Sequence, residues 1–189
     1  MKKKDVKKLF LFIGAVIVML FGTYIFTDEE SGSVMGEEYF ENATIVLGDR
    51  EYYRVSRVVD GDTIALGDNT KIRYIGINTP ETRHPEKGRE CFGEKAKEAN
   101  EMLVGGKYVR LESDISDSDR YGRLLRYVYV LDDPAGETEV FVNEYLVQNG
   151  FAFSSTYPPD VRYQDVFEEA EERARQENAG LWSECEYGE

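Results

Sequence analysis

The chain has few cysteines, histidines and prolines. Its 189 residues include two Cys, one His, one Trp and five Pro. Two cysteines allow at most a single disulfide, and the lone histidine has no neighbouring Cys, which argues against a zinc site. A hydrophobic fraction of 41% and an aromatic fraction of 13% are typical of a globular body rather than of a disordered chain. The length suits one domain with a full core plus appendages.

Positive charge is also scarce. Lys and Arg number 23 against 37 Asp and Glu, so the formal net charge is −14. Proteins that bind nucleic-acid backbones normally carry basic patches, and this balance therefore argues against such a partner unless basic residues gather locally. Many of the acidic residues lie between 168 and 189, where they are typical of a solvated helix face and tail.

Long apolar runs are absent except for one, the uncharged stretch from Leu9 to Phe26, which has lysines before it and Asp28, Glu29 and Glu30 after it. Its eighteen residues just suffice to span a bilayer as a helix. The preceding lysines place that end in the cytoplasm. We therefore expect residues 1–27 to form a basic tip and a transmembrane helix in the cell membrane, with the remaining chain outside. A cleaved signal peptide, which would release a secreted protein, is the alternative.

The exported part divides by composition. Residues 28–50 are acidic and rich in small side chains, which predicts a linker, although residues 43–47 have some strand character. We expect the globular domain over 51–185 and an acidic tail over 186–189.

Within that domain, hydrophobic patterns and turn residues predict five strands and three helices. The strands are expected over 51–59, 63–66, 71–77, 108–112 and 124–131. The helices are expected over 89–103, 140–148 and 161–178. This order favours an α+β fold around a small closed barrel.

Four polar motifs are spread over the first two thirds of the domain. They are Asp60-Gly61-Asp62-Thr63, Arg73, Asn78-Thr79-Pro80-Glu81 and Arg120-Tyr121-Gly122-Arg123. Each of the three longer motifs, taken alone, could be a turn, a helix start or a solvated strand end. Together they supply oxygen ligands for a hard cation, a spare carboxylate and separated guanidiniums, which is the inventory that phosphodiester cleavage needs.

In their order and spacing these motifs resemble the staphylococcal nuclease family, and the resemblance runs from about Tyr52 to Ser183. Further matching segments are Asn143 to Gly150 and Gly180-Leu181-Trp182. The resemblance implies an OB-fold-like five-stranded β-barrel with three α-helices. It also implies a calcium-dependent endonuclease that hydrolyses DNA and RNA and leaves 3′-phosphate ends. No protein partner is implied, and a monomer is expected.

The resemblance also assigns roles to residues. Ca²⁺ would be held by Asp62, the side chain of Asn78 and the main-chain oxygen of Thr79, with Asp60 behind them. The catalytic groups would be Glu81, which prepares the attacking water, and Arg73 and Arg123, which clamp the phosphate. Nucleotide contacts would come from Arg120, Tyr121 and Tyr157. Oxygen ligands suit Ca²⁺ and guanidiniums suit phosphate on chemical grounds as well.

Two positions depart from the family pattern. Asn78 stands where well-known members have an aspartate, so one negative charge is missing and weaker calcium binding is expected. Ser155 stands where a second stacking tyrosine is expected. The alternative function is a catalytically inactive OB-type module that binds nucleic acid or protein. Arg73, Glu81 and Arg123 are all present, which favours the enzyme.

The two cysteines are Cys91, at the start of the first predicted helix, and Cys185, at the end of the predicted domain. In an exported protein they could form one disulfide between the first helix and the C-terminus. Two free buried thiols are the alternative.

Overall fold

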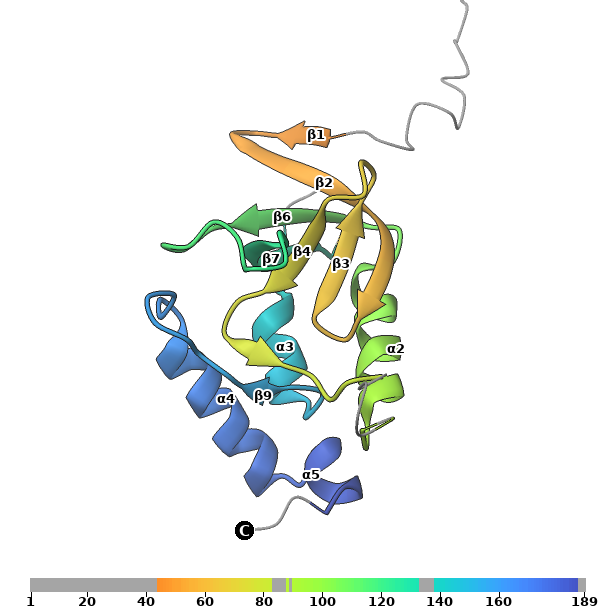
Figure 1. Ribbon diagram of the computed structural model, residues 1–189, viewed down its shortest axis with the longest axis vertical. Helices are drawn as coiled ribbons and strands as arrows, with labels where there is room; N and C mark the ends of the chain where they lie inside the picture. Colours follow the sequence, from red (N-terminus) through yellow and green to blue (C-terminus); the bar gives the residue numbers. More distant parts are fainter. Residues whose placement is uncertain (1–43, 83–87, 89, 133–137, 187–189) are drawn as a thin grey trace, which may run out of the picture. The chain divides into compact units, whose positions relative to one another are not determined.

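The computed structural model describes residues 44–82, 88, 90–132 and 138–186 (Figure 1). The predicted membrane segment, most of the predicted linker and residues 187–189 of the predicted tail lie outside these ranges. Among the described residues, no helix combines the length and the apolar character needed to cross a membrane.

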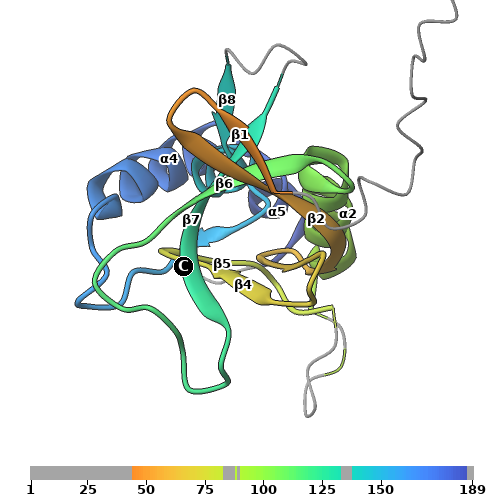
Figure 2. The ribbon, with the colours of Figure 1, turned by 90° about the horizontal axis from the view of Figure 1, so that it is seen from above.

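Five strands close into a barrel. They are β2 (Arg50–Asp60), β3 (Thr63–Leu66), β4 (Lys71–Tyr74), β6 (Tyr108–Glu112) and β7 (Leu124–Leu131). The hydrogen-bonded order is β2-β3-β4-β7-β6, and β6 pairs back with β2. All of these pairs are antiparallel except β4 with β7 (Figures 1 and 2). The arrangement fits the OB-fold-like barrel that the resemblance implies.

Two further strands extend the sheet outside the barrel. β1 (Thr44–Leu47) pairs with β2, and β8 (Glu139–Phe141) pairs with β7. The linker prediction for residues 28–50 is therefore wrong over 44–50, because alternate residues of β1 are half-buried against the sheet. The start of the predicted helix 140–148 is wrong for a similar reason, since residues 139–141 complete a strand.

The predicted strand 71–77 is broken in the structure. β4 ends at Tyr74, and the chain turns at Gly76, whose φ is +77°. A Cβ at this position would collide with the ring of Phe167, so the turn packs closely on a helix as well as requiring left-handed backbone. The chain then forms β5 (Ile77–Asn78), which pairs with β9 (Phe153–Ser154).

Within the described ranges, three longer helices and one short helix accompany the barrel. They are α2 (Gly93–Val104), α3 (Val142–Gln148), α4 (Gln164–Gln176) and α5 (Leu181–Glu184). The first three correspond to the predicted helices with shifted starts, and α5 was not predicted. In Figure 1, α2 runs beside β2 while α3 and α4 lie below the barrel.

The hydrophobic core is continuous from the barrel to these helices. Ile64, Ile72 and Val128 from the strands belong to the same buried cluster as Leu146 of α3 and Phe167 of α4. Because β3 is buried along its whole length, the residues at its two ends are held by strands on either side. The site described below begins at one of those ends.

Candidate active site

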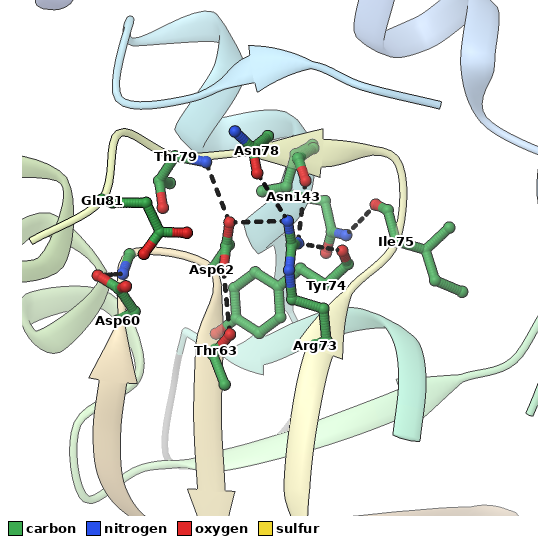
Figure 3. A network of polar contacts seen from close by, with 12 residues as sticks. Asp60, Asp62, Thr63, Arg73, Tyr74, Ile75, Asn78, Thr79, Glu81 and Asn143 are labelled. Atoms are coloured by element: carbon green, nitrogen blue, oxygen red, sulfur yellow. Dashed lines mark hydrogen bonds and ion pairs between the residues drawn. The ribbon is translucent and has the colours of Figure 1, made fainter. Parts of the chain in front are cut away.

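The predicted acidic residues meet where β2 and β3 join and where β4 passes into β5 (Figure 3). In the hairpin of β3 and β4, Thr63 is paired with Arg73. The main-chain N–H of Tyr74 donates to the main-chain oxygen of Asp62 at 3.0 Å. Strand register therefore brings Asp62 beside Arg73, although the two are well separated in sequence.

A close backbone approach brings the second segment in. A Cβ at Gly61 would lie 2.7 Å from the hydroxyl oxygen of Thr79, so only glycine lets the 60–62 turn contact Thr79. The Asp62 carboxylate is buried there and accepts hydrogen bonds from the Thr63 hydroxyl and from the main-chain N–H of Thr79, both at 3.0 Å. Asp62 is therefore held rigidly from both sides.

Arg73 is committed to several oxygens at once. Its Nη1 donates to the main-chain oxygens of Tyr74 and Ile77 at 2.7 and 2.9 Å. Its Nη2 lies 3.0 Å from Oδ2 of Asp62 and 3.0 Å from Oδ1 of Asn78. Arg73 thus contacts side-chain oxygens of Asp62 and Asn78, the two residues whose side chains the resemblance assigns to the cation.

Glu81 lies at the acidic edge of the network, near Asp60 (Figure 3). Burial, together with the negative charges of Asp60, Asp62 and Glu90, raises the pKa of Glu81 from 4.5 to about 7. Asp60 also hydrogen-bonds the protonated form of Glu81, which raises its pKa further. This edge of the site therefore carries negative charge that the surrounding groups do not fully balance.

Two buried amides support the site, and sequence analysis assigned neither of them a role. Asn100 of α2 donates to the main-chain oxygen of Asp60 at 3.1 Å and accepts from the Tyr74 hydroxyl at 2.9 Å. Burial raises the pKa of Tyr74, so this hydroxyl keeps its proton. Asn143 donates to the main-chain oxygen of Ile75 at 2.9 Å (Figure 3). The sequence showed only that each Asn lies within a predicted helix. It could not show that the side chain is buried.

The basic residues lie on the loop that precedes β7. Nε and Nη2 of Arg123 are each 2.7 Å from Oδ2 of Asp119. Burial works against the shift, but hydrogen bonds from the main chain and side chain of Arg123 lower the pKa of Asp119. Arg120 donates to the Tyr121 hydroxyl at 2.6 Å and lies over its ring. Tyr121 itself is 68% exposed, so it is available to stack on a base.

Asp160 joins two loops of this basic side. Its buried carboxylate accepts hydrogen bonds from the main-chain N–H groups of Ile115 and Ser116 at 3.0 and 2.7 Å. The loop of Asp160 also carries Tyr157, which is 75% exposed. Sequence analysis did not identify Asp160 or Asp119 as part of the site.

A pocket of about 510 Å³ lies on the basic side of the site and extends to Arg73 and Asn78; its size is typical of ligand pockets. Its lining includes Arg73, Asn78, Asp119, Arg120, Arg123 and Tyr157. Asp60, Asp62, Thr79, Glu81 and Tyr121 are not among the lining residues. A separate pocket of about 380 Å³ lies beside Arg54 and Arg126, but none of the predicted site residues lines it.

The donor set suits a hard cation of the calcium type. Asp62 supplies a carboxylate, Asn78 an amide oxygen and Thr79 a main-chain oxygen, and Ca²⁺ accepts such mixed oxygen ligands together with water. The unbalanced negative charge at Glu81 fits a nearby cation as well. Within the described ranges, no three Asp, Glu, His or Cys side chains form a metal cage, so amide, main-chain and water oxygens would complete the coordination.

Several known proteins are similar in sequence to this chain. A family profile described as staphylococcal nuclease homologue matches residues 71–184. A protein named thermonuclease from Staphylococcus hyicus is 35% identical over 147 residues, which cover 76% of this chain and 83% of that protein. The thermonuclease of Staphylococcus intermedius is 34% identical over 175 residues, covering 91% of this chain and 94% of that protein. Endonuclease YncB of Bacillus subtilis is 36% identical over 138 residues, which cover 70% of this chain and 62% of that protein.

Proposed function

The chain belongs to the staphylococcal nuclease homologue family, and on this premise we propose that it is a calcium-dependent nuclease that hydrolyses DNA and RNA and leaves 3′-phosphate ends. One observation carries the proposal. The guanidiniums of Arg73 and Arg123 line one pocket, and the carboxylate of Glu81 lies next to the same network with its charge unbalanced by the surrounding protein.

The calcium site would be formed by the oxygens of Asp62, Asn78 and Thr79, with Asp60 behind them. When bound, Ca²⁺ supplies positive charge that offsets the charge of the phosphate and makes a nearby water more acidic. In the family pattern a carboxylate stands at the position of Asn78, and here an amide replaces it. The amide keeps the oxygen donor and loses the charge.

The remaining steps belong to the side chains of this chain. Glu81 accepts a proton from water, whose oxygen forms a bond to phosphorus. The bond from phosphorus to the 5′ oxygen breaks, and that oxygen leaves as a 5′-hydroxyl after taking a proton. Arg73 and Arg123 donate hydrogen bonds to the phosphate oxygens while negative charge builds on them.

Arg120, Tyr121 and Tyr157 would bind the neighbouring nucleotides. Both tyrosines are largely exposed at the side of the arginines, and stacking on an aromatic ring tolerates any base. This property agrees with a substrate range that includes both DNA and RNA.

The decisive experiment compares hydrolysis in calcium with hydrolysis in a chelator. We expect the full chain to cleave single-stranded DNA in calcium only, and Glu81→Ser and Arg123→Gly to lose about 10²-fold or more of the rate. Glu169→Ser, on an exposed face of α4, is the matched control and should cleave like the wild type. Equal activity of all variants, or activity unaffected by the chelator, would refute the proposal.

The inactive binding module gives a different result in the same assay. It would retain DNA in a filter-binding or anisotropy measurement without releasing shorter fragments. Such binding without cleavage in the wild type would favour the module over the enzyme.

We further propose that the nuclease domain lies outside the cell membrane, tethered by residues 9–26 or secreted after cleavage. The disulfide between Cys91 and Cys185 supports an oxidising compartment. Protease added to intact cells should degrade the domain while a cytoplasmic marker protein survives. Survival of the domain under those conditions would contradict the proposal.

A further inference from the structure

The main chain of Glu81 is joined to the residue that precedes the disulfide. The N–H of Glu81 donates to Oε2 of Glu90 at 3.0 Å. The N–H of Glu90 donates in return to the main-chain oxygen of Glu81 at 3.1 Å. This reciprocal pair fixes the backbone from which the Glu81 carboxylate extends.

The start of α2 packs on the same backbone. A Cβ at Gly93 would lie 2.7 Å from the main-chain oxygen of Glu81 and 3.0 Å from that of Pro80. The N–H of Gly93 donates to the main-chain oxygen of Glu90 at 3.2 Å. The segment from Glu90 to Gly93 therefore forms one wall behind Glu81.

A covalent bond ties this wall to the C-terminal part of the fold. Cys91 follows Glu90 directly and forms a disulfide with Cys185, with 5.9 Å between the Cα atoms. Cys185 follows α5, in which Leu181 is fully buried and donates from its N–H to the main-chain oxygen of Gly150 at 2.9 Å. The wall behind Glu81 is thus attached to an element that is anchored in the core.

We propose that the Cys91–Cys185 disulfide and Glu90 position Glu81 for its role as the base, so that the chain reaches its full turnover only when the bond is formed. This inference rests on the proposed nuclease function. Glu90 is a positioning residue, because it acts through the backbone of Glu81. Cys91 is exposed and Cys185 half-buried, so a dithiol in solution can reach the bond. Reduction passes two electrons and two protons from the dithiol to the sulfurs, and the dithiol closes to its own disulfide.

The effect should fall on turnover rather than on substrate binding. Arg123 is oriented by Asp119, and the loops next to Tyr157 are joined by Asp160. None of these contacts involves the segment from Glu90 to Gly93. Loss of the disulfide should therefore misplace the base while the phosphate-binding groups keep their geometry.

The test measures kcat and KM separately on single-stranded DNA in saturating calcium, with the full chain. It uses a temperature at which near-ultraviolet circular dichroism shows every variant to be folded. The variant Cys91→Ser/Cys185→Ser should lose about tenfold in kcat, since small misplacements of a reacting group carry losses of this order or more. Its KM should stay within about twofold of the wild-type value, because the phosphate-binding contacts remain. Reduced wild type should behave in the same way.

The matched control removes a contact at the same junction without breaking the disulfide. Glu184 forms an ion pair with Lys95 between α5 and α2, and Glu184→Ala should keep the wild-type kcat because exposed pairs contribute little. Glu90→Ala should lower kcat several-fold by loss of positioning. Glu90→Gln keeps an acceptor oxygen for the Glu81 N–H and should restore most of the rate. Combined with the two serines, Glu90→Ala should cost less than it does alone.

The outcomes separate the inference from the function on which it rests. Wild type that fails to cleave in calcium refutes the proposed function. Active wild type with an equally active, folded serine variant overturns the positioning role alone. A serine variant with raised KM and unchanged kcat also overturns it, as does a Glu90→Gln variant that is no better than Glu90→Ala.

Discussion

Two carboxylates of the domain, Glu139 and Glu81, differ in how their charge is balanced. Glu139 of β8 accepts hydrogen bonds from Nε and Nη2 of Arg110 at 2.9 and 2.8 Å, and from the Tyr52 hydroxyl at 2.7 Å. These bonds, with that of Arg110 foremost, lower the pKa of Glu139 although burial opposes the shift. Glu81 has no cationic partner among the described residues, and the pKa of Glu81 is raised to about 7.

This difference is the one expected between a structural carboxylate, Glu139, and the proposed catalytic carboxylate, Glu81. A carboxylate paired with arginine stabilises the fold in its charged form, whereas a carboxylate crowded by like charges destabilises it. Such crowding is expected where a site must attract a cation or transfer a proton. Glu139, in its cluster with Arg50, Tyr52 and Arg110, and Glu81, in the acidic half of the site (Asp60, Asp62 and Glu81), should therefore respond oppositely to the same substitution.

The largest effect is expected for Glu81→Gln. Loss of the base should lower kcat by about 10²–10⁴-fold. In a chelator, the free energy of unfolding should stay equal or rise, because repulsion of Asp60 and Asp62 is relieved. Single-turnover hydrolysis and urea unfolding measure the two quantities. A loss of stability as large as that of Glu139→Gln would break the comparison.

Glu139→Gln should give the reverse result: a loss of stability with little change in kcat. The half-buried Arg110 loses the closer of its two charge partners and keeps only Glu112, at 3.6 Å, so the free energy of unfolding should fall by about 2–3 kcal/mol. Its kcat should stay within about twofold of wild type while the protein is folded, since the cluster lies outside the site residues. Glu169→Gln on α4 is the control and should change stability by less than about 0.5 kcal/mol. A large drop in kcat for folded Glu139→Gln would contradict the assignment.

The stability gap between wild type and Glu139→Gln should depend on pH. Because the folded-state pKa of Glu139 lies below its usual 4.5, the folded protein holds the charged form more strongly than the unfolded chain does. The contribution is fully present above the unfolded pKa, and it is lost as the pH falls through the folded pKa. Urea midpoints measured from neutral to acidic pH should therefore converge for the two proteins. A gap that persists unchanged below the folded pKa would show that the charge is not its source.

The smallest effect is expected for Asn78→Asp, which restores a negative ligand to the acidic half. Calcium affinity should rise about tenfold, or about 1.4 kcal/mol, because ligand charge strengthens calcium binding. Titration calorimetry measures the change. Asn69→Asp adds the same charge at the turn between β3 and β4 and should leave affinity nearly unchanged. Equal gains in the two variants would mean that general charge, and not coordination, controls affinity.

Local patterns were enough to predict most of the barrel. The strands β2, β3, β6 and β7 were each expected within about a residue of their observed bounds, since alternating hydrophobic residues and turn residues are local signals. The break in the strand 71–77 was missed, because it depends on the close approach of Gly76 to Phe167. The short helix α5 was missed because a single buried leucine has no periodicity.

For the candidate site as well, the sequence predicted one part and only the structure showed the other. Motifs in the sequence were sufficient to name Asp62, Arg73, Glu81 and Arg123. They could not show that Arg73 spans Asp62 and Asn78, or that Asp119 orients Arg123. These contacts depend on strand register and loop packing, which a motif does not encode.

By itself, the sequence determined the order of the barrel strands and the three longer helices, the family motifs and the supply of carboxylates, amides and guanidiniums. Only the tertiary structure decided that β6 returns to β2 to close the barrel and that Glu90 and Cys91 lie behind Glu81. Composition and periodicity report on neighbours along the chain, whereas the charge balance of Glu81 is set by groups that folding brings from different segments.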